Sequence, residues 1–204
     1  MKKDICSTQD YLVSGETFSI RWDESKGFAA TYPQPDAKKL GLYYESDAYI
    51  SHNESQQSVV GFLYRFARRY MFRVKHKMFK KLLPADATIL DYGCGTGGFL
   101  EYTSSQSYRS FGVETSAKAR EQATRKNLAV AESWENLAQE KFNLISMWHV
   151  LEHVSDLDHC VQEIQNRLDI NDILLIAVPN LNAFDALHLY LIHISEPTRR
   201  TPIS

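Results

Sequence analysis

The residues best suited to chemistry lie in a glycine-rich stretch near the middle of the chain. The apolar run Thr88–Tyr92 is followed by Gly93, Gly95, Gly97 and Gly98. Glycine adopts positive φ without steric cost and lets a ligand come close to the backbone. A helix beginning near Gly97 would point its unpaired N–H groups and positive dipole end at that ligand. The stretch therefore predicts a strand, a tight turn and a helix that bind a nucleotide-like ligand.

Two carboxylates flank this loop at characteristic distances. Asp91 comes immediately before the turn, and Glu114 ends the apolar run that begins at Ser110, about twenty residues further on. An ionised carboxylate at that second place can accept hydrogen bonds from both hydroxyls of a ribose. Read literally, the loop also fits the dinucleotide pattern G-x-G-x-x-G, through Gly93, Gly95 and Gly98. A nicotinamide-binding loop has an apolar residue where Asp91 stands, so the acid argues against that cofactor.

A second chemical cluster follows the apolar run Phe142–Met147. The next residues are Trp148 and His149, and the carboxyl-end rule for open parallel sheets places them at the border of a ligand crevice. An imidazole there can accept a proton from a substrate, although a packing role for His149 is about equally favoured. His149 and His153 are four residues apart, but Val150 stands where the zinc-protease pattern requires a glutamate, so we predict no metal.

From Thr88 to Asn182 the chain resembles the class I S-adenosylmethionine-dependent methyltransferases. The first motif of that family is an acidic residue, any residue, and then Gly-x-Gly-x-Gly, which here is Asp91, Gly93, Gly95 and Gly97. A second motif, Leu-Glu-His-Val after the fourth strand, corresponds to Leu151–Val154. The resemblance implies S-adenosylmethionine as the cofactor and transfer of its methyl group to an acceptor.

The resemblance also implies a set of site residues. The cofactor-binding candidates are Asp91, Gly93, Cys94, Gly95, Gly97, Glu114, Thr115, Glu132, Ser133, Trp148 and His149. Glu132 and Ser133 follow the third strand, where this family contacts the adenine ring, while Trp134 is expected there or in the core with equal weight. The aromatic face of Trp148 would favour the positively charged sulfonium, and His149 is the catalytic candidate.

The alternation of apolar runs with helical patterns predicts an α/β, Rossmann-like, doubly wound and mainly parallel sheet. Five strands of the family fold are present and its last two are missing. The strands are expected at 88–91, 110–114, 128–131, 142–147 and 172–178, and the helices at 97–105, 116–127 and 155–168. Ser155 and Asp158 predict a capping-box-like helix start. The near-continuous apolar content of 172–178 predicts a central strand covered on both faces.

Short strands at 11–13, 17–22 and 28–32 predict a small N-terminal segment. It resembles a module that in some bacterial methyltransferases holds zinc with paired C-x-x-C sequences. Here the equivalent place reads Asp23-Glu24-Ser25-Lys26-Gly27-Phe28, without cysteine, so we expect no structural zinc. The predicted division is a segment at 1–36, a helical lid or linker at 37–86, the cofactor-binding domain at 87–186 and a tail at 187–204 that does not resemble the family.

The longest helical pattern covers 57–83 and is strongly basic. Its apolar stripe falls at positions 59, 63, 66, 67, 70, 74, 78 and 82. Its other positions carry Arg65, Arg68, Arg69, Arg73, Lys75, Lys77, Lys80 and Lys81, with no acid between them. One interpretation is an anionic or lipid-linked substrate, or an anionic membrane surface, bound through helix 59–83. The other, which the pattern favours, is a lid helix whose stripe packs on the domain and whose cations are solvated.

Composition limits the remaining choices. The chain has 204 residues, 44% hydrophobic and 24% charged, with a net charge of −2, so nothing in the overall charge indicates a nucleic-acid partner. Three widely spaced cysteines favour a reducing compartment, and no apolar run has the length of a signal peptide or a membrane span, so we expect a cytoplasmic protein. The sequence predicts a methyltransferase acting on a small-molecule acceptor. A binding or scaffold protein without activity, or less favourably a nicotinamide-dependent oxidoreductase, remains the alternative.

Overall fold

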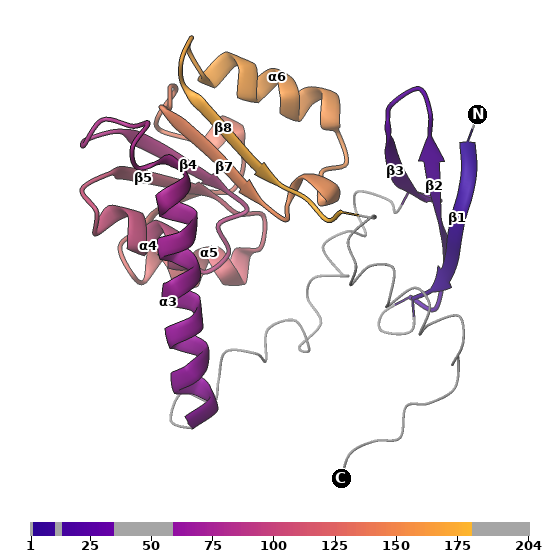
Figure 1. Ribbon diagram of the computed structural model, residues 1–204, viewed down its shortest axis with the longest axis horizontal. Helices are drawn as coiled ribbons and strands as arrows, with labels where there is room; N and C mark the ends of the chain where they lie inside the picture. Colours follow the sequence, from indigo (N-terminus) through magenta and orange to yellow (C-terminus); the bar gives the residue numbers. More distant parts are fainter. Residues whose placement is uncertain (1, 11–13, 35–58, 181–204) are drawn as a thin grey trace. The chain divides into compact units, whose positions relative to one another are not determined.

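The computed structural model describes residues 2–10, 14–34 and 59–180 (Figure 1). The chain forms two units, one of Met1–Leu82 with Ser116–Lys118 and the other of Leu83–Thr115 with Ala119–Ser204. The finer division predicted above, with boundaries at 36, 86 and 186, stays a prediction. The strand expected at 11–13, the part 37–58 of the predicted lid and the tail 187–204 lie outside the described residues. In the described ranges no helix has the length and apolarity needed to cross a membrane.

The first unit contains a three-stranded antiparallel sheet in the order β1-β2-β3. Its strands are β1 Lys2–Gln9, β2 Thr17–Asp23 and β3 Phe28–Tyr32. The two later strands confirm the prediction, but β1 was missed. Its sequence, KKDICSTQ, lacks the apolar alternation that reveals a strand, and it is held by backbone pairing along β2 from Lys2↔Asp23 to Gln9↔Thr17.

The sequence resemblance would place zinc ligands in the turn between β2 and β3. Here Asp23 organises it, because its Oδ1 accepts a hydrogen bond from the Ser25 N–H at 3.0 Å and its carbonyl accepts one from the Gly27 N–H at 2.8 Å. Gly27 has φ +71°, which suits glycine. Within the described ranges no three His, Cys, Asp or Glu residues gather as a metal site. The shape of the turn therefore rests on an aspartate and a glycine.

The basic helix is α3, Val59–Phe79. The predicted packing of its apolar stripe on the domain stays a prediction, because the helix and the parallel sheet belong to different units. Leu63, Phe66 and Tyr70 of the stripe are 60%, 63% and 60% exposed. Among the helix side chains whose burial is described, His76 and Phe79 are buried, and both lie outside the stripe. Burial and the nearby Lys80 charge lower the pKa of His76, which favours its neutral imidazole.

The second unit is built on a five-stranded parallel sheet in the order β6-β5-β4-β7-β8, which confirms the predicted Rossmann-like fold (Figure 1). The strands are β4 Thr88–Tyr92, β5 Arg109–Val113, β6 Ala129–Ala131, β7 Leu144–Trp148 and β8 Ile173–Ala177. The helices are α4 Gly98–Ser104, α5 Ala117–Thr124 and α6 Leu157–Arg167, with short 3₁₀ turns at η2 Trp134–Asn136 and η3 Leu151–His153.

All five strands run parallel, but the order in which the chain adds them to the sheet changes sides at β4. From β4 it proceeds to β5 and β6 on one side, and then returns to β7 on the other side, so that Asp91 pairs with both Gly112 and Ser146. In open parallel sheets the ligand binds at this switch point, outside the carboxyl ends of the strands. The fold therefore brings the loops after β4, β5, β6 and β7 to one edge.

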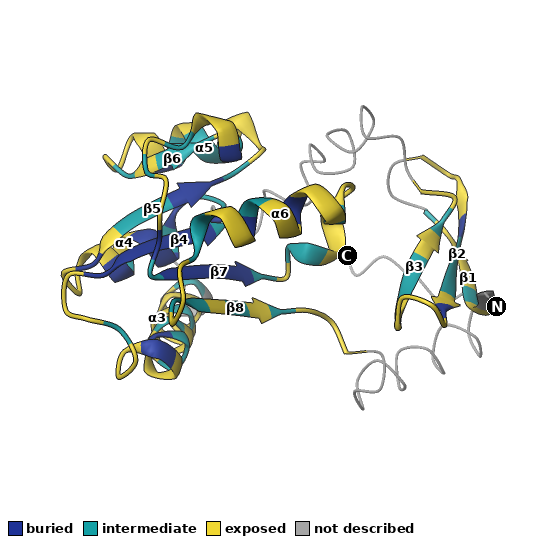
Figure 2. Cartoon of the chain, turned by 90° about the horizontal axis from the view of Figure 1, so that it is seen from above, coloured by how far each residue is buried: buried dark blue, intermediate teal, exposed yellow. Residues whose placement is uncertain are grey.

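The core lies between the central strands and the helices that cover them, and Figure 2 shows β4 and β7 as largely buried. Ile89, Leu90, Leu144 and Ile145 are fully buried, because both faces of these two strands are covered. Phe142, just before β7, is 1% exposed and packs edge-on against Phe111 of β5.

Two predictions about the last elements were wrong. The strand at 172–178 was expected to be central, but β8 is the last strand of the sheet and its Leu174 and Ile176 are 42% and 40% exposed. The strand is as apolar as predicted, but in the described part of the chain only one of its two faces is covered. The cap of α6 is Asp156, whose Oδ1 accepts from the His159 N–H at 2.9 Å, and not Ser155.

Candidate functional site

The glycine loop turns directly out of β4. The N–H groups of Gly93 and Cys94 both donate to the carbonyl of Val113 at the end of β5, at 2.7 and 3.1 Å. Gly93, Gly95 and Gly97 have φ of +76°, +56° and +76°, and α4 then begins at Gly98. Positive φ at three alternate positions is costly for any residue with a Cβ, which explains the spacing of the motif.

The three glycines differ in what surrounds them. A Cβ on Gly93 would overlap Cγ2 of Val150, from the loop after β7, and a Cβ on Gly97 would overlap Cδ1 of Leu128. At Gly95 nothing lies within 4 Å of the same position. Gly93 and Gly97 are therefore needed for packing, whereas Gly95 leaves open space beside the backbone, as a bound cofactor requires.

Glu114 turns its carboxylate toward this loop. Its Oε2 accepts a hydrogen bond from the N–H of Gly95 at 2.8 Å, so the acid and the open glycine are in contact although nineteen residues separate them. Its own N–H donates to the carbonyl of Ala131 at 3.0 Å. The predicted ribose acceptor therefore stands at the edge of the open space over Gly95.

Asp91 points the other way, into the sheet. The residue is 4% exposed, and its Oδ1 accepts from the hydroxyl of Ser146 on β7 at 2.7 Å. This bond joins the two strands that diverge at the switch point. A contact between the Asp91 carboxylate and the cofactor stays a prediction, while its role in holding β4 and β7 together is visible.

Cys94 contributes its backbone to the loop and hides its side chain. The residue is 8% exposed, and a Cβ on Gly112 would lie 2.6 Å from the Cys94 sulfur, so the thiol fills the space beside that glycine. Burial, together with the charges of Asp91 and Glu114, raises the pKa of the Cys94 thiol. A buried thiol that stays protonated at neutral pH is a packing group and not a nucleophile.

Trp148 and His149 end β7 beside the loop. The half-buried Trp148 ring meets the Phe99 ring of α4 edge-on, with centroids 6.2 Å apart. His149 is exposed, has φ +56°, and donates its backbone N–H to the carbonyl of Ala177 at 2.8 Å. Its Nδ1 lies 3.7 Å from Oε1 of Glu152. A positive φ at a residue other than glycine is strained, and such strain is concentrated at functional sites.

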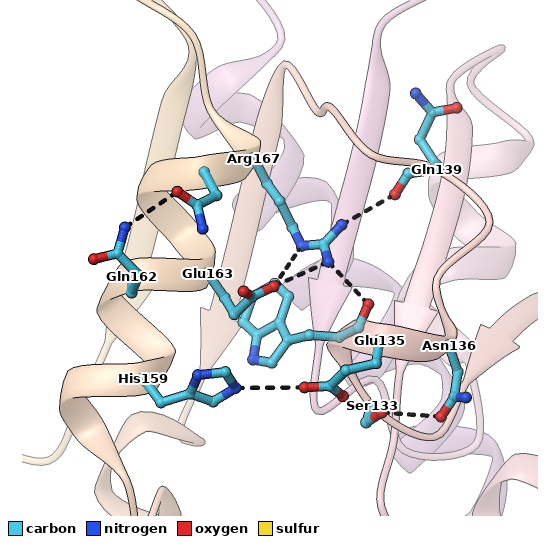
Figure 3. Close-up of polar contacts among 10 residues, drawn as sticks. Ser133, Glu135, Asn136, Gln139, His159, Gln162, Glu163 and Arg167 are labelled. Atoms are coloured by element: carbon cyan, nitrogen blue, oxygen red, sulfur yellow. Dashed lines mark hydrogen bonds and ion pairs between the residues drawn. The ribbon is translucent and has the colours of Figure 1, made fainter.

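The loop after β6 is held mainly by its neighbours in the fold (Figure 3). Trp134 is 3% exposed and stacks on Tyr92 with centroids 4.4 Å apart, so it belongs to the core. Arg167 of α6 donates to the Trp134 carbonyl at 3.0 Å and pairs with Glu163 at 2.9 Å. The hydroxyl of Ser133 donates to Oδ1 of Asn136 at 2.9 Å. Burial is the main cause that raises the pKa of Tyr92 to about 12.

The structure thus brings together Gly95 and Glu114, and it places Trp148 against the helix that follows the glycine loop. Sequence reasoning missed Val150, Ser146, Arg120 and Arg167. The first two touch Gly93 and Asp91 from more than fifty residues away, and the arginines act through backbone carbonyls. Of these four residues, only Val150 could have been suspected from the sequence, because it lies inside the Trp148–Val154 stretch.

Three solved structures illustrate the similarity of the fold. A SAM-dependent methyltransferase from Thermotoga maritima is 21% identical, with 66% of each chain covered and a TM-score of 0.48. The YcgJ protein from Bacillus subtilis is 19% identical over 62% of this chain and 58% of its own, with a TM-score of 0.49. A TehB-like SAM-dependent methyltransferase from Corynebacterium glutamicum is 18% identical over 55% and 70%, with a TM-score of 0.44.

The chain spans only part of the length of solved structures that it matches, for example 46%, 58% and 53% of three of them. No curated protein matches it. The sequence profile described as "Methyltransferase domain" matches residues 63–199, which is more than half of the chain and includes every element of the parallel sheet. The glycine loop, with its open space at Gly95 and the carboxylate of Glu114 beside it, fits S-adenosylmethionine as the cofactor. The chain belongs to the S-adenosylmethionine-dependent methyltransferase family.

Proposed function

We propose that this protein transfers a methyl group from S-adenosylmethionine to a small-molecule acceptor, and that the cofactor lies over Gly95 between the loops after β4, β5 and β7. The observation that carries the proposal is the contact between Gly95 and Glu114, because it joins an unobstructed backbone to a carboxylate at the carboxyl edge of the sheet. Asp91, Gly93, Cys94 and Gly97 shape the loop, while Thr115, Glu132 and Ser133 line its continuation.

The cofactor supplies a methyl group that is already activated by a sulfonium, so the protein has to align the acceptor and exclude water. Glu114 holds the ribose hydroxyls through charge-assisted hydrogen bonds. Trp148 presents an aromatic ring on the β7 side, where a positive charge is favoured by the ring face.

His149 is the residue that we assign to proton transfer. Its Nδ1 faces Glu152, so Nε2 is the nitrogen that accepts the proton of an acceptor hydroxyl. Its position directly after β7 puts it at the switch-point edge, on the side from which an acceptor approaches. An acceptor that carries no proton to lose would not need this residue.

The first test is calorimetric titration of the chain and of Glu114→Ala with S-adenosylhomocysteine, with a nicotinamide dinucleotide as the control ligand. We expect saturable binding of the first ligand alone. Loss of a charge-assisted acceptor in Glu114→Ala should weaken it by about 1.5–3 kcal/mol. Glu121→Ala, on the exposed face of α5, is the matched control and should bind like the unaltered chain.

Three other results would change the proposal. Equal affinity of Glu114→Ala and the unaltered chain would remove the ribose assignment. Tight binding of the nicotinamide compound alone would favour an oxidoreductase. Binding of S-adenosylhomocysteine, with no methylation of any compound in a broad panel of hydroxylated and amino acceptors, would favour a binding or scaffold role.

A lipid-linked or other anionic acceptor is the second candidate, and α3 favours it. The helix pattern at 57–83 carries eight cations and no acid, and its large apolar side chains, such as Phe62 and Phe66, are 62% and 63% exposed. Flotation with phosphatidylglycerol vesicles would test this, with phosphatidylcholine vesicles as control. Binding should be lost in Phe66→Asp and retained in Ile170→Asp, which places the same charge at an even more exposed apolar residue outside α3. Equal flotation with both lipids would contradict an anionic acceptor.

We further propose the cytoplasm as the place of action, since the three widely spaced cysteines favour a reducing compartment. The described structure holds Cys6, Cys94 and Cys160 as free thiols.

A further inference from the structure

Arg120 on α5 directs its guanidinium back to the ends of two strands. Its Nη1 donates to the carbonyls of Glu114 and Thr115, at 2.8 and 2.6 Å. Its Nη2 lies 3.1 Å from Oε2 of Glu132, just after β6. The arginine side chain is 19% exposed, while that of Glu132 is 66% exposed. One guanidinium therefore contacts three residues that we assign to the cofactor site, although none of its atoms lies within 4 Å of the Cβ position at Gly95.

With the contact from Arg120, both the backbone and the carboxylate of Glu114 are held by hydrogen bonds. Its N–H donates to Ala131 of β6, its carbonyl accepts from Arg120, and its carboxylate accepts from the N–H of Gly95. With both backbone groups engaged, rotation of the peptide at the end of β5 is restricted, and the side chain leaves the strand in one direction. That direction leads to the glycine loop.

We propose that Arg120 is a positioning residue for the cofactor. It holds the Glu114 carboxylate in line with the ribose, whereas its ion pair with the exposed Glu132 carboxylate contributes little. The inference rests on the proposed role of Glu114. The geometry requires arginine, because a planar guanidinium offers several donors in fixed directions, whereas a lysine ammonium cannot serve two adjacent carbonyls and a carboxylate equally.

A merely structural role is the alternative, in which Arg120 only joins α5 to the sheet. The two roles predict different effects of removing Arg120 from a chain that already lacks the Glu114 carboxylate. If Arg120 acts through that acid, its removal should matter little once the acid is gone, whereas loss of packing would add to the loss of the acid. A double-mutant cycle of Arg120→Met and Glu114→Ala therefore separates them.

The cycle is measured as the dissociation constant of S-adenosylhomocysteine by calorimetry, with urea unfolding of each variant in parallel. We expect Arg120→Met to weaken binding about 10-fold in the unaltered background and less than about 2-fold beside Glu114→Ala, because contacting groups of one network are not additive. Arg120→Lys should recover little of the affinity. Arg125→Met, on the same helix in an exposed pair with Glu121, should leave binding unchanged.

The 2′-deoxyribose form of S-adenosylhomocysteine gives a second readout. The unaltered chain should prefer the complete ribose by about 10-fold, the value of one charge-assisted hydrogen bond, and Arg120→Met should lose most of that preference. A purely structural arginine would weaken both ligands equally. Should Arg120→Met fail to fold, Arg120→Lys provides the same comparison with the charge retained.

Equal weakening of binding by Arg120→Met in both backgrounds, or an unchanged preference for the complete ribose, would overturn the positioning role while leaving Glu114 as the ribose acceptor. If Glu114→Ala bound S-adenosylhomocysteine normally, the proposed site itself would be wrong, and Arg120 would lose its role with it. The two failures are thus distinguished by the single variant of Glu114.

Discussion

The two sides of β4 are built in different ways. On the β5 and β6 side, Gly93, Cys94 and Gly95 are all engaged by the backbone or side chains of the neighbouring strand end, and Arg120 joins that strand end to the next loop. On the β7 and β8 side, His149 is exposed and the last strand leaves Leu174 and Ile176 partly open.

This difference is what we expect if the first side binds the cofactor, which never changes, and the second side binds the acceptor, which can vary. A cofactor that is the same in every turnover is best held by donors and acceptors fixed in advance, because preorganisation lowers the ordering cost of binding. An acceptor is distinguished by the shape and chemistry of less constrained loops. We therefore expect variants on the first side to change cofactor affinity and variants on the second to change turnover.

Gly95→Val should give the largest effect and tests the first half of the comparison. A branched side chain would fill the open space over the loop, so S-adenosylhomocysteine binding should fall more than about 100-fold, equivalent to about 2.7 kcal/mol. The matched control is Gly15→Val, because Gly15 also has positive φ and open surroundings but lies in the turn before β2. Both variants place a β-branched residue at a positive φ, +56° at Gly95 and +68° at Gly15. Normal binding by Gly95→Val would place the cofactor elsewhere.

His149→Asn tests the other half. Asparagine accepts the left-handed backbone of this position, so the change removes the imidazole with little added strain. With a hydroxyl acceptor, turnover should fall about 10²–10⁴-fold while S-adenosylhomocysteine affinity stays the same. The measurement is steady-state methylation beside calorimetry, with His153→Asn as control. A loss of cofactor affinity equal to the loss of turnover would contradict the separation of the two sides.

Ser146→Ala concerns the bond that joins the two sides. It removes one donor to the buried Asp91 carboxylate, so the free energy of unfolding in urea should fall by about 1–3 kcal/mol. Ser110→Ala removes a contact between two neutral hydroxyls, with Thr103 at 2.8 Å, and should cost about 1 kcal/mol or less. An equal cost for both would mean that the charge of Asp91 is not what makes this link important.

The strands that were predicted correctly are those with a strong local pattern in the sequence. The run before Gly93 and the run before Trp148 are apolar, short and bounded by turns, and both form strands of the sheet as expected. Glu114 was selected by its distance from the glycine loop, and its carboxylate accepts from the N–H of Gly95, while its role as ribose acceptor stays a prediction. Periodicity and glycine spacing are local properties, and these elements depend on them.

The missed features depend on partners that are distant in sequence. β1 forms because β2 offers it a backbone edge, and its polar sequence gives no sign of this. The exposure of Leu174 follows from the place of β8 in the sheet and not from its composition. Arg120 and Arg167 look like ordinary helix cations until the carbonyls that accept their hydrogen bonds are known.

The central position of β4 has a consequence for the order of folding. During synthesis β5 and β6 emerge soon after β4, so this half of the sheet can pair early. The other neighbour of β4 arrives late, because Ile89 pairs with Leu144 and the amide of Thr88 donates to the side chain of Asn143, fifty-five residues further along the chain. Closing so long a loop is slow and entropically unfavourable. We therefore expect the glycine loop to reach its final shape only after Val150 has packed against Gly93.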